Sequence, residues 1–517
     1  MSAHGTTPDA HFRQKMTIVL FCVLGGALGK GLVDLGWTLA YEWHRPYVAD
    51  NVLFIAMGRA IVNGLTPYVD LFENKPPVIF LLAALSLRLF DTIILGRMLQ
   101  ILTILVIPLI TGFCGYRLLQ RSTEKSERWM DTLIVLLFGF VLAVLTSKWA
   151  GAFYPESFGI MFSLLYIAWF VTTRTSAWPA VLLGGMFVAG ALGFKEVFLF
   201  SLLAIALVLS ESRPEFVVKF CLPLCVAVVI GALVLLVLGY LIPYITVYLS
   251  YLLRWHGDFM SLVHPEAAPF WQRGLPLYSF WHTAARVSVA FPLLIVLLWS
   301  ILLMQFRSLW RTRRAIIAFC VLFGATYSAV FAGQIAGGKT HHYAVSLPFL
   351  VALLLRVMQS EAWSRIHWIR LGVVLSLCAI VLQQRTTFLM KDFAEETQRL
   401  LMAQHVAEQV DFVLDNCDVD RYLRIVVPDS PELLFVRHSP LPTGLMSTRD
   451  YNNMALPPFN RMLSQSLLDA QIVLAIKDFG VHTDVHHYLQ EHFTKSPWPC
   501  AGPFNLPEGL SLLFRKT

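Results

Sequence analysis

Long apolar runs, separated by short polar stretches, occupy most of the first 385 residues. Each run approaches the 20 or so apolar residues that a helix needs to cross the hydrocarbon core of a bilayer. The pattern predicts eleven membrane-spanning helices, at residues 16–40, 98–119, 131–147, 158–173, 178–194, 197–210, 220–242, 286–304, 315–331, 344–357 and 371–383. Counts of ten, twelve or thirteen stay open. The first run is longer than the apolar part of a cleavable signal peptide, so we interpret it as an uncleaved anchor.

The loop at 40–97 contains two further apolar stretches that are too short to span. Residues 51–62 are apolar at helical spacing, which predicts a helix lying along the membrane surface. The Pro76-Pro77 pair predicts the start of another short helix, because proline suits the first turn. A long aromatic stretch at 243–282 is interpreted as a second loop.

Beyond residue 385 the pattern changes to short, mixed periods. Residues 390–417 have helical periodicity with a charged face, and 485–493 predict another helix. Strand-like runs occur at 424–428, 432–436, 471–476 and 511–516. We therefore expect two domains: a transmembrane domain at 1–385 and a small α/β domain at 386–517. Cys417 and Cys500 lie in the second, and an extracytoplasmic location would allow them to form a disulfide.

The basic residues fall in alternate loops. Arg13 and Lys15 precede the first run, and the loops predicted on the same side carry ten more basic residues: Arg174, Arg213, Lys219, Arg307, Arg311, Arg313, Arg314, Arg356, Arg365 and Arg370. Because basic loops stay in the cytoplasm, this pattern predicts an odd number of spans, a cytoplasmic N-terminus and a C-terminal domain outside.

Composition agrees with a polytopic membrane protein. Of 517 residues, 57% are hydrophobic and only 14% charged, against about 25% charged in soluble proteins. The net charge of +7 is carried by short loops and gives no reason to expect a nucleic-acid partner. The spacing from Gly25 to Lys30 is not that of a phosphate-binding P-loop, and no zinc-type cluster of cysteine and histidine stands out.

The loops predicted on the outer side collect a different set of polar residues. These are Asp50, Asp70, Glu73, Lys75, Glu156, Lys195, Arg254, His256, Lys339, His341 and His342. Lysine and arginine bind phosphate, and a carboxylate beside a hydroxyl can remove its proton during transfer. The set suits an amphiphilic substrate whose lipid lies among helices and whose phosphate and sugar lie at the outer surface.

The stretch TPYVDLFENKPPVIFLLAAL at 66–85 resembles a signature of GT-C-fold glycosyltransferases of bacterial inner membranes. These enzymes use polyprenyl-phosphate-linked sugars and include lipid A aminoarabinose transferases and protein O-mannosyltransferases. The acidic residue early in their first outer loop corresponds to Asp50. Their aromatic turn and Lys-Pro-Pro segment correspond to Tyr68, Phe72 and Lys75-Pro76-Pro77. Two further segments are similar: Gly193-Phe194-Lys195-Glu196, and His342-Tyr343 before Leu347-Pro348.

The resemblance implies an α-helical polytopic membrane protein with about eleven transmembrane helices and a small C-terminal extracytoplasmic α/β domain. It implies an inverting transfer in which Asp50 is the catalytic base and Lys75 stabilises the departing polyprenyl phosphate. The remaining expected substrate- and phosphate-binding residues are Tyr68, Glu156, Lys195, Arg254, His256, Lys339, His341, His342 and Tyr343. The expected partners are a polyprenyl-phosphate-linked sugar donor, a lipid, glycan or protein acceptor, and membrane lipids.

Simpler interpretations of the same residues stay open. Asp50 can cap the helix that begins near Asn51, and Lys75 can extend to the membrane interface. Glu156 can be a helix-start carboxylate, and the histidines can be interfacial.

Many relatives carry an acidic pair where this chain has Asp50-Asn51, so we expect a metal-independent enzyme without a cofactor. Three other classes compete with a GT-C transferase. One, a purely structural assembly subunit, gives no reason for the composition of the first outer loop. A flippase for lipid-linked oligosaccharides would place charges at mid-membrane depth. An O-antigen polymerase or ligase would favour a large, arginine-rich central outer loop.

Overall fold

The computed structural model describes residues 8–47, 50–73, 75–120, 125–174, 177–254, 340–359, 367–383 and 387–418. It also describes Cys320, Gly324 and, in the C-terminal region, 425–426, 444–445, 467–468, 470–476, 484–506, 508 and 510–516. The predicted span at 286–304, the strand at 432–436 and all of the predicted span at 315–331 except Cys320 and Gly324 lie outside these residues.

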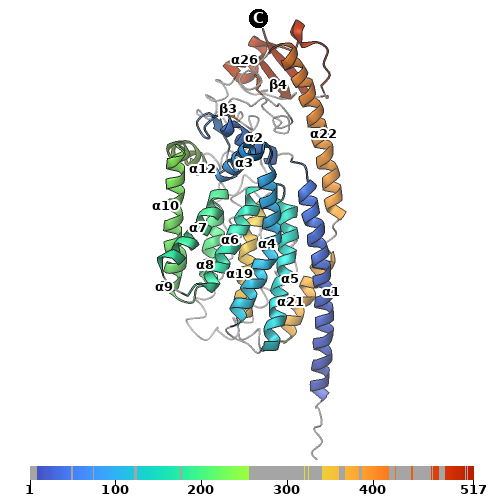
Figure 1. Ribbon diagram of the computed structural model, residues 1–517, viewed down its shortest axis with the longest axis vertical. Helices are drawn as coiled ribbons and strands as arrows, with labels where there is room; N and C mark the ends of the chain where they lie inside the picture. The colour runs from blue at the N-terminus through green and yellow to red at the C-terminus, as the bar shows by residue number, and fades with distance from the viewer. Residues whose placement is uncertain are drawn as a thin grey trace, which may run out of the picture.

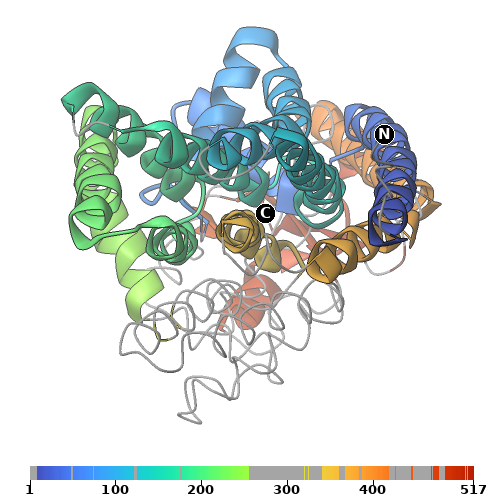
Figure 2. The same cartoon turned by 90° about the horizontal axis from the view of Figure 1, so that it is seen from below.

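A bundle of long apolar helices forms most of the molecule (Figure 1). Its helices coincide with the other predicted spans: α1 (Pro8–His44), α4 (Ile94–Leu119), α5 (Lys125–Ala150), α6 (Pro155–Thr172), α7 (Trp178–Phe194), α8 (Phe198–Leu209), α10 (Leu222–Val237), α19 (Leu347–Met358) and α21 (His367–Gln383). Viewed along the bundle in Figure 2, α1 and α21 lie on the side opposite α10. These elements confirm the helical, multi-pass membrane architecture.

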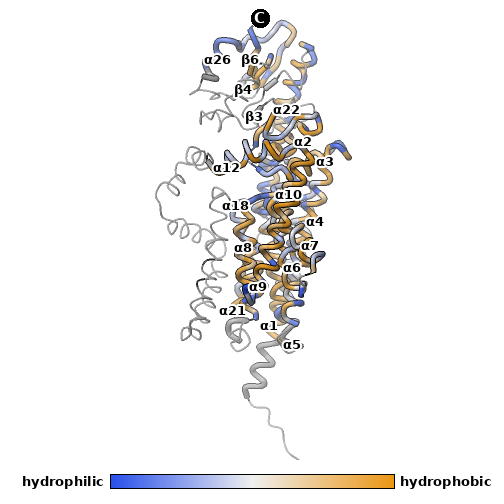
Figure 3. The backbone as a smooth tube through the Cα atoms, turned by 90° about the vertical axis from the view of Figure 1, so that its left-hand side faces the viewer, coloured by the Kyte–Doolittle hydropathy of each residue, from blue (hydrophilic) through white to orange (hydrophobic). Residues whose placement is uncertain are grey.

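Five described helical segments are long and apolar enough to cross a membrane: Ile94–Leu118, Trp129–Ala150, Pro155–Thr172, Arg213–Val237 and His341–Met358. The fourth runs through α9 (Arg213–Phe216) and the π-helical η1 (Val217–Cys221) into α10. It therefore begins before the predicted residue 220. Figure 3 shows the apolar character of the bundle and the more polar C-terminal end.

Two short helices lie at the end of the bundle that faces the C-terminal region (Figure 1). They are α2 (Asp50–Val62) and α3 (Val78–Phe90), as the sequence predicts, and β1 (Leu71–Phe72) lies between them. Gly58 allows their close approach, because a Cβ there would lie 2.5 Å from the side chain of Ala83. The two helices thereby hold the intervening loop over the bundle.

The prediction of a loop from residue 243 is wrong for its first part. The chain is helical through α11 (Leu241–Pro243), the π-helical η2 (Tyr244–Leu249) and α12 (Ser250–Arg254). Tyr244, Tyr248 and Tyr251 recur at intervals of four and three residues, which places them on one helix face. Tyr248 and Tyr251 are buried against the β1 loop.

The C-terminal region begins with α22 (Thr387–Asn416), which extends from the bundle beside α1 to the far end of the molecule (Figure 1). A four-stranded sheet follows in the order β2-β4-β6-β5. Its strands are β2 (Ile425–Val426), β4 (Ile472–Ile476), β5 (Phe493–Thr494) and β6 (Leu510–Arg515), with α26 (Asp484–His492) before β5. β2 pairs parallel with β4, and β6 pairs antiparallel with β4 and β5.

Two covalent or backbone links tie this region together and to the first loop. Cys417 and Cys500 form the predicted disulfide across 83 residues of sequence, joining the end of α22 to the short η4 (Pro499–Ala501). β1 pairs parallel with β3 (Gly444–Leu445), with Leu71 opposite Gly444 and Phe72 opposite Leu445. One apolar core accordingly extends from α2 and α3 into α22 and the sheet.

Candidate functional site

A buried ion pair marks the end of the bundle below the first loop. Glu156 lies in the first turn of α6, after Tyr154 and Pro155, where the helix dipole favours a carboxylate. Lys195 follows the last residue of α7 in extended backbone, and its Nζ donates a hydrogen bond to Glu156 Oε1. Both residues are buried, and the second carboxylate oxygen of Glu156 accepts no hydrogen bond from the residues that the structure describes.

A glycine explains how Lys195 reaches this position. Gly193 lies in the last turn of α7, and a Cβ there would come within 2.8 Å of Val78 at the start of α3. Only the absence of a side chain allows α7 to end this close to the Lys75-Pro76-Pro77 segment. The lysine turn is thus packed directly against the start of the first-loop helix.

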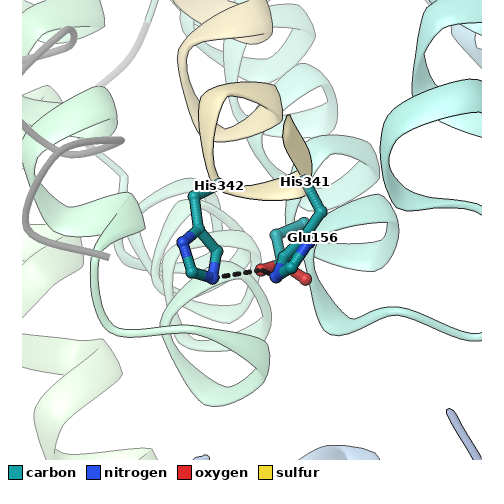
Figure 4. A group of neighbouring side chains, drawn as sticks. All are labelled: Glu156, His341 and His342. Carbon is teal, nitrogen blue, oxygen red and sulfur yellow. Dashed lines mark ion pairs between the residues drawn. The ribbon is translucent and has the colours of Figure 1, made fainter. Parts of the chain in front are cut away.

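Two adjacent histidines approach the same carboxylate from a distant part of the chain. His341 and His342 lie in α18 (Thr340–Tyr343), which leads through η3 (Ala344–Ser346) into α19. The Nε2 atom of each lies 4.0 Å from Glu156 Oε1 (Figure 4). The ring of His341 also lies 4.8 Å from that of Tyr154, just before α6. Glu156 is therefore the centre of a cluster built from three segments.

Lys75 lies in the loop above this cluster. Tyr68, at φ 65°, donates a hydrogen bond of 2.7 Å to the backbone oxygen of Lys75 and so fixes the turn before it. The Lys75 Nζ lies 3.7 Å from Glu73, and its side chain is only 15% exposed. Burial lowers the pKa of Lys195; the Glu156 carboxylate opposes this shift, and the charge of Lys75 adds to it. Lys75 thus adds positive charge to the surroundings of Lys195, which favours an anion there.

The site includes residues that sequence reasoning did not select. Glu196, beside Lys195, accepts a hydrogen bond of 2.8 Å from the Tyr248 hydroxyl. The ring of Tyr248 lies 5.3 Å from that of Tyr68 and 4.9 Å from that of Tyr244. Burial raises the pKa of the Glu196 carboxyl. The four-residue spacing of Tyr244 and Tyr248 is the sequence signal that favours a helix here.

Several predicted residues are placed only in part. Asp50 is the first residue of α2 and Arg254 the last of α12, but their side chains lie outside the description, as do His256 and Lys339 entirely. Tyr343 is buried beside the histidines. The structure thus brings Glu156, Lys195, His341 and His342 together and leaves the position of the Asp50 carboxylate as a prediction.

Asn51, next to Asp50, is also buried, with a side-chain oxygen that accepts no hydrogen bond from the described part of the chain. The start of α2 therefore offers a polar group that is not used by the fold as described.

The cluster has the donors of a metal site. One donor atom from each of Glu156, His341 and His342 lies within 4.8 Å of the other two, and all three residues are buried. A carboxylate and two imidazoles form a set that binds divalent transition metals.

Comparison with known proteins shows which solved structures have a similar fold. No protein-family model matches the chain, and no curated protein is significantly similar to it in sequence. Among solved structures it is similar to ArnT from Cupriavidus metallidurans, solved with bound undecaprenyl phosphate. The TM-score is 0.54 at 12% identity, and the match covers 95% of this chain and 98% of the other. A likeness over almost the whole of both chains shows that they share a fold.

Proposed function

We propose that this protein, a multi-pass membrane protein with the GT-C fold, is a glycosyltransferase that uses a polyprenyl-phosphate-linked sugar. The observation that carries the proposal is the likeness to ArnT over 95% of the chain. The buried group of lysine, glutamate and histidine below the first loop supports it, because that group suits a phosphate and a sugar.

The cations of the site would bind the donor phosphate. Lys75 is held by the turn that Tyr68 closes, and Lys195 approaches from α7. A phosphate between two ammonium groups gains charge-assisted hydrogen bonds. It also removes the repulsion that the two positive charges exert on each other. Arg254, His256, Lys339 and Tyr343 are proposed as further contacts to the donor.

The proposed reaction is an inverting transfer. The acceptor hydroxyl oxygen attacks the anomeric carbon of the sugar, and Asp50 accepts its proton. The bond between the anomeric carbon and the phosphate oxygen breaks, and its electron pair leaves with polyprenyl phosphate. Lys75 stabilises the charge that develops on this leaving group. Attack opposite the leaving group inverts the anomeric configuration.

The acceptor is a lipid, a glycan or a protein at the outer face of the bacterial inner membrane. We assign residues 1–385 to the transmembrane catalytic domain and 386–517 to a periplasmic domain. Pairing of β1 with β3 supports a role for the second domain in covering or shaping the acceptor side, since it lies against the loop that carries Lys75.

The test is donor cleavage by purified protein. Wild type should release polyprenyl phosphate. Asp50→Asn should release it at least about 100-fold more slowly, and Lys75→Ala should be similarly slow. Asp70→Asn is the matched control, because Asp70 lies in the same loop and its carboxylate accepts a hydrogen bond from the Thr66 N–H at 2.7 Å. Equal loss in Asp50→Asn and Asp70→Asn would contradict the role of Asp50 as base.

A further inference from the structure

We propose that Glu156, His341 and His342 form a divalent-metal site of the zinc class whose open position takes the donor phosphate. The inference rests on the proposed function for the identity of the phosphate, but the metal site itself stands on the geometry. It departs from the sequence-based expectation of a metal-independent enzyme. That expectation depended on Asp50-Asn51, a different part of the site.

The donor types and their number favour a site with an open position. Two histidines and one glutamate are the three protein ligands of one well-known class of catalytic zinc site, in which water or substrate supplies the fourth. All three are buried, and the two imidazoles approach the carboxylate from the same short helix (Figure 4). Structural zinc sites, in contrast, are closed by four protein ligands.

The distances are close to those that a metal requires. Tetrahedral coordination with bonds of about 2.1 Å places neighbouring donor atoms about 3.4 Å apart. The two separations from Glu156 Oε1 to histidine Nε2 are 4.0 Å. These two must close by about 0.6 Å, and the widest separation within the 4.8 Å limit of the three donor atoms by up to about 1.4 Å; side-chain rotations supply movements of this size.

The charge of the cluster defines the fourth ligand. The Glu156 carboxylate and the Lys195 ammonium cancel, and neutral histidines add nothing. A dication alone would leave two uncompensated positive charges in a buried site, which is costly. A phosphate monoester such as polyprenyl phosphate carries nearly two negative charges and restores balance. The metal would therefore hold the leaving group more tightly than the donor diester, as Lewis-acid catalysis requires.

Lys195 gives the proposal a distinctive consequence. Its Nζ donates a hydrogen bond to Glu156 Oε1, which is also the oxygen near both histidines. Lys195 therefore competes with a metal for that carboxylate. Glu156 Oε2 accepts no hydrogen bond within the described structure and offers a second attachment point. Replacing Lys195 by methionine removes the competitor and one positive charge. The variant should bind a dication about tenfold or more tightly, whereas a purely structural ion pair predicts no such gain.

The experiment measures metal binding to the full-length, untagged protein in mild detergent. Equilibrium dialysis against Zn²⁺ should give about one tightly bound ion per chain, and Co²⁺ should give the intense visible absorption of a tetrahedral site. His341→Ala, His342→Ala and Glu156→Gln should each weaken metal binding about 100-fold. Loss of a residue that only hydrogen-bonds to a metal ligand weakens binding about 10- to 100-fold, and loss of a ligand should cost at least as much. His492→Ala, an exposed histidine in the C-terminal region, is the control and should change nothing.

Either of two results would overturn the site. One is the absence of a tetrahedral Co²⁺ spectrum in wild type, a measurement that needs no variant to fold. The other is unchanged stoichiometry in the folded His341→Ala/His342→Ala protein, which would assign the metal to other histidines. Donor cleavage is measured separately. Cleavage without metal binding refutes only this inference, and metal binding without cleavage refutes only the proposed function.

Discussion

Arg45 connects the end of α1 to α22, and the structure predicts unequal costs for removing the two charges of this link. Its Nη2 lies 2.5 Å from Glu396 Oε1, and its Nε lies 2.9 Å from Glu396 Oε2. Its Nη1 lies 3.4 Å from the buried Glu42. The arginine and Glu396 side chains are only 12% and 14% exposed, so solvent screens them little.

The magnitudes follow from what each replacement leaves behind. Glu396→Gln keeps Arg45 paired with Glu42, so the cost is that of a charge-assisted hydrogen bond, about 1.5–3 kcal/mol. Arg45→Met leaves Glu42 and Glu396 without their cation. Glu42 retains the Ser147 hydroxyl and the Ala152 N–H as donors, but an uncompensated buried charge costs about 3–5 kcal/mol. The double variant should cost less than the sum of the single variants, because the two residues interact directly.

Hydrogen exchange of the α22 amides, measured by mass spectrometry, reports the free energy of its local opening. At about tenfold in rate per 1.4 kcal/mol, Glu396→Gln should accelerate exchange at least about tenfold and Arg45→Met by more. Lys391→Met is the control on the same helix. Its ion pair with Glu395 is 3.7 Å long and has side chains 79% and 60% exposed, so it should change little. Equal effects of Arg45→Met and Lys391→Met would refute the reasoning.

Three further predictions concern other parts of the fold. Replacing Cys417 and Cys500 by serine should lower the free energy of unfolding of the C-terminal region by about 2–5 kcal/mol, measured by denaturant titration, and an unchanged midpoint would contradict it. Gly58→Ala should separate α2 from α3 and lower the rate of donor cleavage, because the new Cβ would lie 2.7 Å from a backbone nitrogen of α3. Gly25→Ala is the control and should have no effect, because no other atom lies within 4 Å of the position of its Cβ. The third prediction concerns Glu196, whose carboxyl has a raised pKa in the folded state because burial penalises its charged form. The free energy of unfolding of Glu196→Gln should therefore exceed that of wild type by a margin that grows as pH rises above about 4.3, where the carboxyl of the unfolded chain ionises. The gain should level off above that folded pKa, and a thermal-unfolding difference that falls with pH would contradict the assignment.

The spans were predictable because each is an almost unbroken apolar run whose length the bilayer fixes. The first-loop helices were predictable for a related reason: apolar residues at helical spacing form α2, and a proline pair precedes α3. The helical start of the aromatic stretch at 241–254 was missed, because tyrosines and a proline within an uninterrupted sequence favour helix and loop almost equally.

The site was predictable as residue types but not as geometry. Glu156, Lys195, His341 and His342 stood out as polar residues in apolar surroundings, and each lies at or next to the end of a helix. Their convergence on one carboxylate depends on helix packing, for example on Gly193 against Val78, which no local pattern encodes. The pairing of β1 with β3 was likewise invisible, since two-residue strands more than 300 residues apart carry no shared periodicity.

The most direct test of the central claim is the fate of a radiolabelled polyprenyl-phosphate sugar in vesicles that contain the purified protein. The account predicts that wild type cleaves the donor and releases free polyprenyl phosphate, and that Lys75→Ala does so far more slowly. Labelled lipid that crosses the vesicle membrane intact, with no release of polyprenyl phosphate, would contradict it and identify the protein as a lipid-linked sugar transporter.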